Sequence, residues 1–362
     1  MPLPDIAPAW PEGLTDKMRG PAAWYGPDMA ARSDWIEPLA GQALDELRDA
    51  SQRWLDAQPQ PLPSDPAAPE VSAALRGLTR QTFPLPGLST WLSEVLRELQ
   101  SGRGFVLLRG LPVAQWGPLL SAVAFYGLGQ YLGAARSQNA QGHLLGHVRD
   151  VGLASTDPNV RIYQTRERQT FHTDSCDIVG LLCLQASRSG GLSALVSSVT
   201  LYNELRERRP DLAPWLFAPV ATDRRGEVPA GAKPWFEIPV FNWHAGHLSA
   251  IYQRQYIDSA QRFEAAPRLS PAHREALDLL DALTNDPALH FTMALQPGDM
   301  QFVHNHHLLH DRTAFEDWPE PERARYLLRL WLAPAQARPL PEVYAQRYGS
   351  VVVGQRGGVM VG

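Results

Sequence analysis

Apolar residues recur every three or four positions in the first third of the chain, a spacing that predicts helices. The pattern covers Gly41–Ala57 and Leu88–Leu99, and the proline-rich linker "QPQPLPSDPAAPE" lies between them. A short buried strand is expected at Arg103–Pro112, followed by a mostly apolar helix at Trp116–Tyr131. The first forty residues are rich in Pro, Trp and Asp without a clear period, and we expect them to wrap over the surface of a later domain.

From Arg161 onward the pattern changes to short strand-like runs separated by Gly and Pro. The runs are "VRIYQT", "IVGLLCLQAS", "LSALVSS", "FEIPVF", "LHFTMAL", "MQFV" and "RYLLRLWL". Two predicted helices interrupt them, one from near Ser198 and one at Ser270–Leu283, where Ser270 is the N-cap and a proline follows. Many short strands with helical insertions favour a β-sandwich or barrel core over repeated βαβ units.

The charge balance argues against a nucleic-acid or lipid partner. The 362 residues include 33 Lys+Arg and 38 Asp+Glu, a net charge of -5, with 44% hydrophobic residues. This composition is that of an ordinary globular protein and does not suggest a large basic surface. A small-molecule partner is therefore the simpler expectation.

Several features favour a cytoplasmic protein. The opening "MPLPDIAPAWPEGLTDKMRG" has prolines and acids where a secretory signal needs a basic start and an apolar run. No stretch approaches the ~20 apolar residues of a membrane span. The two cysteines, Cys176 and Cys183, exclude a disulfide framework and are expected to be buried as small apolar residues. The sequence leaves the oligomeric state open, including a homo-oligomer.

The run "FHTDSCD" contains a candidate half of a metal site. On an extended segment, His172 and Asp174 point the same way, so both could bind one cation. A second histidine would complete a facial triad that leaves three positions open on Fe(II). Four candidates occur in "GDMQFVHNHHLLHDR": His304, His306, His307 and His310. The alternatives are a hydrogen-bonded turn around His172 and a surface or zinc-scavenging histidine tract.

The strand-like run "RARYLLRLWL" places two arginines on one face. Alternation puts Arg325 and Arg329 together with Leu327 and Trp331, while the opposite face is also largely apolar. Both arginines are therefore expected to be buried. A buried guanidinium needs an anion, which a bound carboxylate could supply. An internal salt bridge is the alternative.

Together these motifs resemble the TauD/TfdA-like family of Fe(II)- and 2-oxoglutarate-dependent dioxygenases. The resemblance covers Tyr163–Leu332 and rests on "FHTD", "GGLSALVSSVTLYNEL", "PGDMQFVHNHHLLHDR" and "RYLLRLWL", in the order typical of the family. It implies a mainly β fold, a double-stranded β-helix (jelly-roll, cupin-like) core flanked by α-helices. The expected organisation is an N-terminal extension at 1–100, a core at 101–335 and a C-terminal tail at 336–362.

The resemblance also implies the metal ligands. His172 and Asp174 would be the first two iron ligands. His310 would be the distal ligand, because the family's closing motif is Asn-x-x-x-x-His and Asn305 precedes His310 by five. Family halogenases replace the carboxylate by Gly or Ala so that chloride can bind. The carboxylate of Asp174 therefore makes hydroxylation the default outcome, with desaturation, cyclisation or oxidative cleavage as variants.

For the co-substrate, the resemblance places Arg325 where the family binds the distal carboxylate of 2-oxoglutarate. Taurine-type members also offer a threonine hydroxyl after the Gly-Gly pair, where this chain has Val196. Ser193, Ser197 or Ser198 could supply that hydroxyl instead.

The implied reaction oxidises a substrate C–H bond with O₂ while 2-oxoglutarate becomes succinate and CO₂. Arg329 falls where some family members bind an anionic substrate group and others support the site. Tyr163 and Gln169 share the parity of Phe171 and could line the pocket, and Asn139 could lie on a lid loop. We expect a small carboxylate-bearing or amino-acid-like substrate. A zinc hydrolase with the same three ligands and a non-catalytic binding relative are the competing hypotheses.

Overall fold

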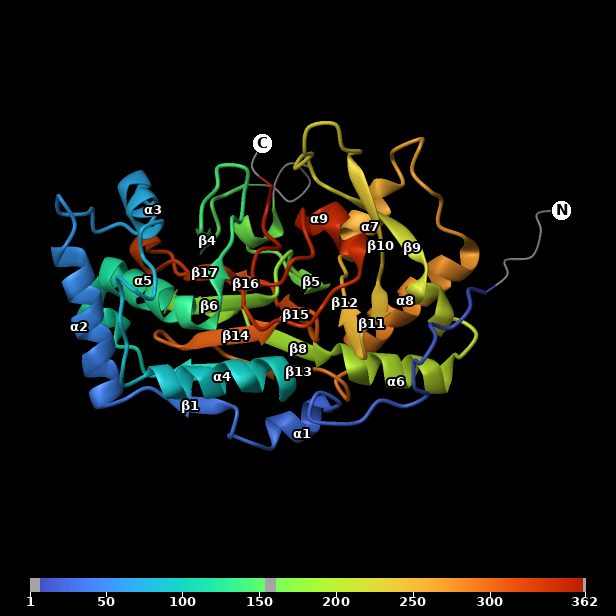
Figure 1. The fold of residues 1–362 in the computed structure, drawn as a ribbon, viewed down its shortest axis with the longest axis horizontal. Helices are drawn as coiled ribbons and strands as arrows, with labels where there is room; N and C mark the ends of the chain where they lie inside the picture. The colour runs from blue at the N-terminus through green and yellow to red at the C-terminus, as the bar shows by residue number, and fades with distance from the viewer. Residues whose placement is uncertain (1–6, 154–160, 361–362) are drawn as a thin grey trace.

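Two β-sheets pack face to face at the centre of the protein (Figure 1). The computed structural model describes residues 7–153 and 161–360. One sheet has seven strands in the order β1-β2-β14-β6-β17-β3, with β4 also beside β17, and the other has four in the order β13-β8-β15-β5. The strands of the larger sheet are β1 (Ile36–Pro38), β2 (Phe105–Arg109), β3 (Ala134–Ala135), β4 (Leu145–Val148), β6 (Ile178–Gln185), β14 (Met300–His304) and β17 (Tyr326–Ala333). Those of the smaller sheet are β5 (Gln169–His172), β8 (Ser193–Ser197), β13 (Phe291–Met293) and β15 (Leu308–Arg312).

The chain passes repeatedly from one sheet to the other. Strands β4, β6, β14 and β17 lie in the larger sheet, whereas β5, β8, β13 and β15 lie in the smaller one. All neighbours among these eight strands are antiparallel. Because of this alternation, motifs on β5, β15 and β17 meet between the sheets although they are far apart in the sequence.

Four helices lie on the outer side of the larger sheet, and two of them, the third and fourth in chain order, pack closely on its strands. They are α2 (Gln42–Asp56), α3 (Pro69–Leu75), α4 (Ser89–Ser101) and α5 (Val113–Leu132). Their apolar residues join Leu328, Leu330 and Leu332 of β17 in one core cluster, so the alternate residues of that strand face the interior between the sheets. The predicted helices in this region are confirmed, and α5 is interrupted near its start, where Gly117 has a φ of 74° and Pro118 follows. No helix in the described ranges is long and apolar enough to cross a membrane.

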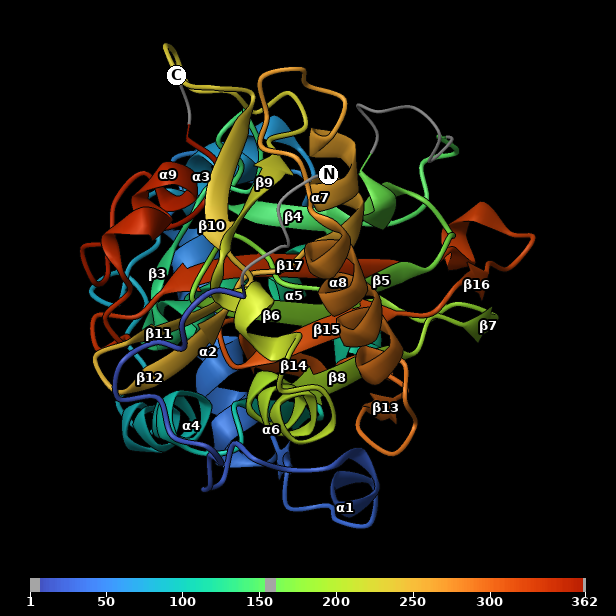
Figure 2. The same ribbon diagram turned by 90° about the vertical axis from the view of Figure 1, so that its right-hand side faces the viewer.

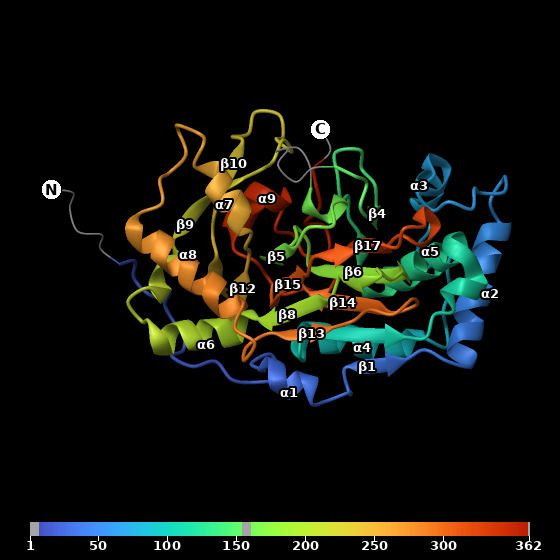
Figure 3. The same ribbon diagram turned by 180° about the vertical axis from the view of Figure 1, so that it is seen from behind.

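Two other helices cover the outer face of the smaller sheet, at the opposite end of the molecule from α2 (Figures 2 and 3). They are α6 (Ser198–Arg208) and α8 (Pro271–Thr284). Both pack on Phe171, Val196 and Leu309. The predicted start of α8 is confirmed, since the hydroxyl of Ser270 accepts a hydrogen bond from the backbone N–H of His273 at 3.2 Å.

Several smaller elements surround the two sheets (Figure 1). The remaining strands form the pairs β7 (Ser189–Gly190) with β16 (Phe315–Glu316), β9 (Pro219–Asp223) with β10 (Trp235–Pro239), and β11 (Phe241–His244) with β12 (His247–Ala250). The remaining helices are α1 (Gly26–Ala30), α7 (Arg254–Ala260) and α9 (Ala345–Tyr348). The last segment of the chain packs into the core, where the fully buried Arg356 pairs with Asp177 at 2.8 Å.

One predicted strand is wrong. Within the run "VRIYQT", Ile162–Gln164 forms a 3₁₀ turn, and the first residue of the run lies outside the described residues. The N–H groups of Gln164 and Thr165 donate to the carbonyls of Arg161 and Ile162. The backbone therefore satisfies its hydrogen bonds locally, which an alternating pattern of apolar residues does not reveal.

We expect Ser270→Ala to lower the free energy of unfolding by about 1 kcal/mol, because the N–H it caps would lose its partner. Chemical denaturation followed by tryptophan fluorescence measures this change. Ser93→Ala is the matched control, since Ser93 lies inside α4 and bonds the carbonyl of Ser89. An equal loss in both variants would contradict the capping role.

Candidate metal centre

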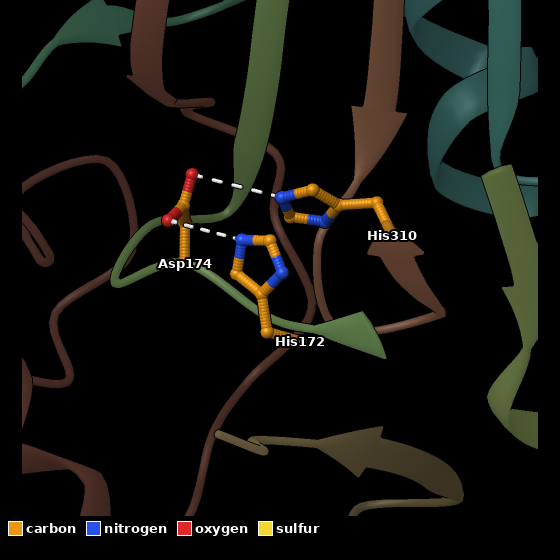
Figure 4. A group of neighbouring side chains, drawn as sticks. All are labelled: His172, Asp174 and His310. Carbon is orange, nitrogen blue, oxygen red and sulfur yellow. Dashed lines mark ion pairs between the residues drawn. The ribbon is translucent and has the colours of Figure 1, made fainter. Parts of the chain in front are cut away.

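The register between β5 and β15 brings two histidines together. His172 lies directly opposite His310 in this antiparallel pair, and their ring centroids are 4.2 Å apart. Asp174 follows two residues after His172, just beyond the end of β5. Figure 4 shows the three side chains converging on one point. Within 7–153 and 161–360, this is the one group of His, Cys, Asp and Glu whose ligand atoms could hold a metal ion.

The spacing of the three side chains suits a shared cation. Asp174 Oδ1 lies 4.0 Å from His172 Nε2, and Oδ2 lies 3.8 Å from His310 Nε2 (Figure 4). The ligand atoms are all within 4.8 Å of one another. Two imidazoles and one carboxylate on one side of an ion form the donor set of a facial triad. The residues present therefore fit Fe(II).

Both imidazoles are held in the neutral form that binds metals. His172 Nδ1 lies 2.8 Å from the carbonyl of Thr170, which can only accept, so Nδ1 donates and Nε2 keeps its lone pair. Burial lowers the pKa of His172. Burial, reinforced by His172, lowers the pKa of His310 to about 3. Neither imidazole needs to lose a proton at neutral pH before it can bind a cation.

Asp174 is held as an anion by its neighbours. Burial raises its pKa, but the opposing influences, of which the Arg329 guanidinium is the largest, outweigh burial and lower the pKa to about 2. Trp331 Nε1 donates to Asp174 Oδ2 at 2.8 Å, and Arg329 Nη1 approaches the same oxygen at 3.4 Å. Arg329 Nε also donates to Gln138 Oε1 at 2.8 Å. Arg329 thus contacts the carboxylate of the candidate metal site and also lines both neighbouring cavities.

Asn305 fixes the turn that carries Asp174. Its Oδ1 accepts the N–H of Asp174 at 2.7 Å, and its Nδ2 donates to the carbonyls of Asp174 and Cys176 at 2.6 and 2.8 Å. The side chain is completely buried. An asparagine five residues before His310 thus links the two arms of the site.

The other three histidines of this stretch lie in the core, away from the triad. His304, His306 and His307 are buried, with His304 and His307 stacked at 4.4 Å. His306 Nε2 lies 2.9 Å from Asp177 Oδ1. The alternative of a surface histidine tract is therefore wrong. Only His310 lies on β15, and the strand register selects it.

Arg325 lies in a cavity shared with the triad. The cavity has about 510 Å³ of empty space, including space open to solvent. Part of its wall is apolar and is formed by Leu181, Leu295 and Leu327. Arg325 is 5% exposed, and its Nη1 has no hydrogen-bond partner among the described residues. Burial lowers its pKa to about 10. No carboxylate of the described ranges forms an ion pair with this side chain, so the structure leaves Arg325 available for a bound anion.

The two candidate serines of β8 lie at opposite ends of the strand, Ser193 at its start and Ser197 at its end, beside α6. Ser193 lines the cavity of Arg325 and donates to Gln301 Oε1 at 3.1 Å. The hydroxyl of Ser197 caps α6 by accepting from Thr200 N at 3.1 Å, and it donates to Ala22 O at 2.5 Å. Val196 packs under α6 and α8 and does not line the cavity. Of these residues, Ser193 is therefore the candidate whose hydroxyl lies beside a group bound in the cavity of Arg325.

Of the candidate substrate residues, some line a cavity next to the triad and one does not. A larger cavity, with about 840 Å³ of empty space, is lined by Tyr163 and Gln169 together with the triad residues His172 and Asp174. Asn139 does not line it; its Nδ2 contacts His143 Nδ1 at 3.1 Å.

The larger cavity also contains arginines that sequence reasoning missed. Arg161, Arg224 and Arg347 line it, from three segments far apart in the chain. No local motif marks these residues, because only the closure of β9, β10 and α9 over the sheets brings them together.

Comparison with known proteins now identifies the family. The profile of the taurine catabolism dioxygenase TauD, TfdA family matches residues 65–331. The chain belongs to the TauD/TfdA family. Among relatives, the FR-33289 synthase of Streptomyces rubellomurinus is 29% identical over 91% of this chain and 94% of its own length. The taurine hydroxylase-like protein SAT17 of Stachybotrys chartarum is 29% identical over 88% of this chain and 80% of its own.

Solved structures agree with this family assignment. An asparagine oxygenase in complex with Fe(II), hydroxyasparagine and succinate aligns with a TM-score of 0.62 at 19% identity, covering 82% of this chain and 93% of that one. The oxygenase OrfP in complex with Fe and alpha-ketoglutaric acid gives 0.59 at 16% identity, with the same coverage. This TauD/TfdA protein is an Fe(II)- and 2-oxoglutarate-dependent dioxygenase, which sets aside the zinc hydrolase and the non-catalytic relative.

We expect the two serines to respond differently to substitution. Ser193→Ala should weaken 2-oxoglutarate binding by about 0.5–1.5 kcal/mol, the range of one hydrogen bond. Ser197→Ala should lower the free energy of unfolding by about 1 kcal/mol and leave 2-oxoglutarate affinity unchanged. Calorimetric titration and denaturant unfolding measure the two quantities. The reverse pattern would assign the co-substrate hydroxyl to Ser197.

Proposed function

We propose that this enzyme hydroxylates an unactivated C–H bond of a small metabolite that carries a carboxylate or resembles an amino acid. The observation that supports this most is that the cavity of Arg325 and the larger cavity both border His172 and Asp174. A co-substrate and a substrate could therefore approach one metal from two sides. Two solved structures of this fold contain amino-acid ligands: an asparagine oxygenase with hydroxyasparagine, and the oxygenase OrfP with hydroxy-L-Arg.

Fe(II) is proposed to be held by His172, Asp174 and His310. When bound, the iron would supply the oxidation of a C–H bond by O₂, coupled to the decarboxylation of 2-oxoglutarate to succinate and CO₂. The protein supplies two neutral imidazoles and an anionic carboxylate. Trp331 and Asn305 fix the orientation of Asp174. Asp174 would supply a third protein ligand to the iron, which supports hydroxylation over halogenation.

Arg325 and Ser193 are proposed to bind the distal carboxylate of 2-oxoglutarate. The planar guanidinium suits bidentate contact with a carboxylate, and its orphaned Nη1 would gain a partner. The side chains of Leu181, Leu295 and Leu327 would pack against the methylene groups of the co-substrate.

Tyr163 and Gln169 are proposed to line the substrate pocket, since both border the larger cavity. Arg329 is proposed to support the site, because it already contacts Asp174 and Gln138.

The two sheets are proposed to form a double-stranded β-helix, which the alternation of eight antiparallel strands between them supports. Residues 101–335 would be this core, with 1–100 as the extension and 336–362 as the tail.

Fe(II)-loaded enzyme should form succinate from 2-oxoglutarate under air, and Asp174→Ala should abolish this activity because one of three ligands is lost. His307→Gln is the control and should retain iron binding, since His307 lies outside the triad. Succinate is quantified by mass spectrometry and bound iron by a colorimetric assay. Loss of iron in His307→Gln but not in Asp174→Ala would show that the wrong residues were chosen.

Arg325→Ala should weaken 2-oxoglutarate binding by ~1.5–3 kcal/mol for each charge-assisted hydrogen bond lost. The apparent KM for 2-oxoglutarate, measured at saturating Fe(II), reports the effect. The matched control is Arg323→Ala, which removes an exposed guanidinium two residues away. An unchanged KM in Arg325→Ala would move this role to another cation in the cavity.

A further inference from the structure

Four arginines line the larger cavity together with two residues of the triad. Arg329 is paired with Asp174, and the other three are Arg161, Arg224 and Arg347. Arg161 precedes the 3₁₀ turn, Arg224 follows β9 and Arg347 lies on α9. The guanidinium carbons of Arg224 and Arg347 lie 5.5 and 6.0 Å from the centre of the Phe236 ring, so both flank one aromatic surface. The cavity therefore contains a local concentration of positive charge beside the metal site.

A single carboxylate forms ion pairs with two of these arginines. Glu227 contacts Arg161 and lies 3.2 Å from Arg347 Nη2. The carboxylate of Asp223 also borders the cavity, but Arg262 and Ser259 already bind it. Three guanidinium groups and one available carboxylate leave two positive charges without a counterion.

Arg224 is the least satisfied of the three. It is 5% exposed, and its hydrogen bonds go to the backbone carbonyls of Lys233 and Gln346. Its Nη1 has no hydrogen-bond partner among the described residues, and no carboxylate there forms an ion pair with it. Burial, together with the nearby Arg347, lowers the pKa of Arg224 to about 10. A buried guanidinium in this state is stabilised strongly by an anion.

We propose that the larger cavity recognises a doubly charged phosphoryl group, a phosphonate or a phosphate monoester, through Arg161, Arg224 and Arg347. A dianion would balance both uncompensated charges, whereas a carboxylate or a sulfonate would balance one. Arginine also matches the geometry of phosphoryl oxygens through its paired N–H donors. This proposal rests on the proposed function, since it names the anionic group by which the substrate of that site is held.

The test measures anion binding without oxygen, with Fe(II) and saturating 2-oxoglutarate present so that Arg325 is occupied. Methylphosphonate, methanesulfonate and acetate are titrated near neutral to weakly basic pH at constant ionic strength by calorimetry. We expect methylphosphonate to bind about tenfold or more tightly than the two monoanions. Equal affinities for the three probes, or no binding of methylphosphonate, would overturn the proposal.

Variants assign the binding to the arginines. Arg224→Gln should weaken methylphosphonate binding about tenfold or more, and Arg224→Lys should restore part of it. Lys233→Gln is the matched control, because it removes the same charge from the same hairpin at a side chain that is 66% exposed and outside the cavity. Unchanged binding in Arg224→Gln would refute the assignment. Thermal unfolding checks each variant, and Arg161→Gln replaces Arg224→Gln should the latter fail to fold.

Two further measurements distinguish the two phosphoryl classes and test the phosphoryl site separately from the dioxygenase activity. Stimulation of succinate formation by 2-aminoethylphosphonate or by O-phosphoethanolamine distinguishes a phosphonate substrate from a phosphate-ester substrate. A preference for 2-aminoethanesulfonate over both compounds would contradict the proposal that the site binds a dianion. Succinate formation without added anion tests the proposed dioxygenase activity separately. An active enzyme that does not bind methylphosphonate would therefore refute only the phosphoryl site.

Discussion

The antiparallel register between β5 and β15 is the constraint on which the site depends. It sets His172 opposite His310, and the end of β5 two residues before Asp174 completes the triad. A shift of one residue would turn either histidine to the opposite face of the sheet, into the core beneath α6 and α8. Asn305 reinforces this arrangement, because its three hydrogen bonds tie the turn of Asp174 to the residues just before β15.

Buried charge is the second feature that organises the interior. Asp174, Arg325 and Arg329 are largely withdrawn from water, yet each has a different balance of partners. Arg329 is matched by Asp174 and Gln138, whereas Arg325 has no carboxylate partner in the described ranges. A protein stabilises such groups only through partners or ligands, so the unmatched arginines mark where anions belong. The same reasoning supports both proposals, 2-oxoglutarate at Arg325 and an anionic substrate group at Arg224.

Local patterns predicted the elements better than the contacts between them. The spacing of apolar residues located α2, α4 and α8. Strict alternation put Arg325 and Arg329 on one side of the chain, and both line one cavity, although Arg325 lies just before β17 and only Arg329 lies within it. The segment around Tyr163 failed, because a short turn satisfies its own backbone. Ser197 was an equal candidate with Ser193 in the sequence, yet its hydroxyl caps α6. Both serines have the same parity in β8, and which end of the strand borders the cavity depends on the packing of both sheets.

The sequence by itself determined the family, the first two candidate ligands and the parity of the arginine strand, because each is a short-range pattern of residue types. Only the tertiary structure selected His310 from four histidines by geometry, since that choice requires the pairing of β15 with β5. It alone also gathered Arg161, Arg224 and Arg347 around one cavity. These residues lie on segments far apart in the chain, and their proximity arises from long-range packing that no local pattern encodes.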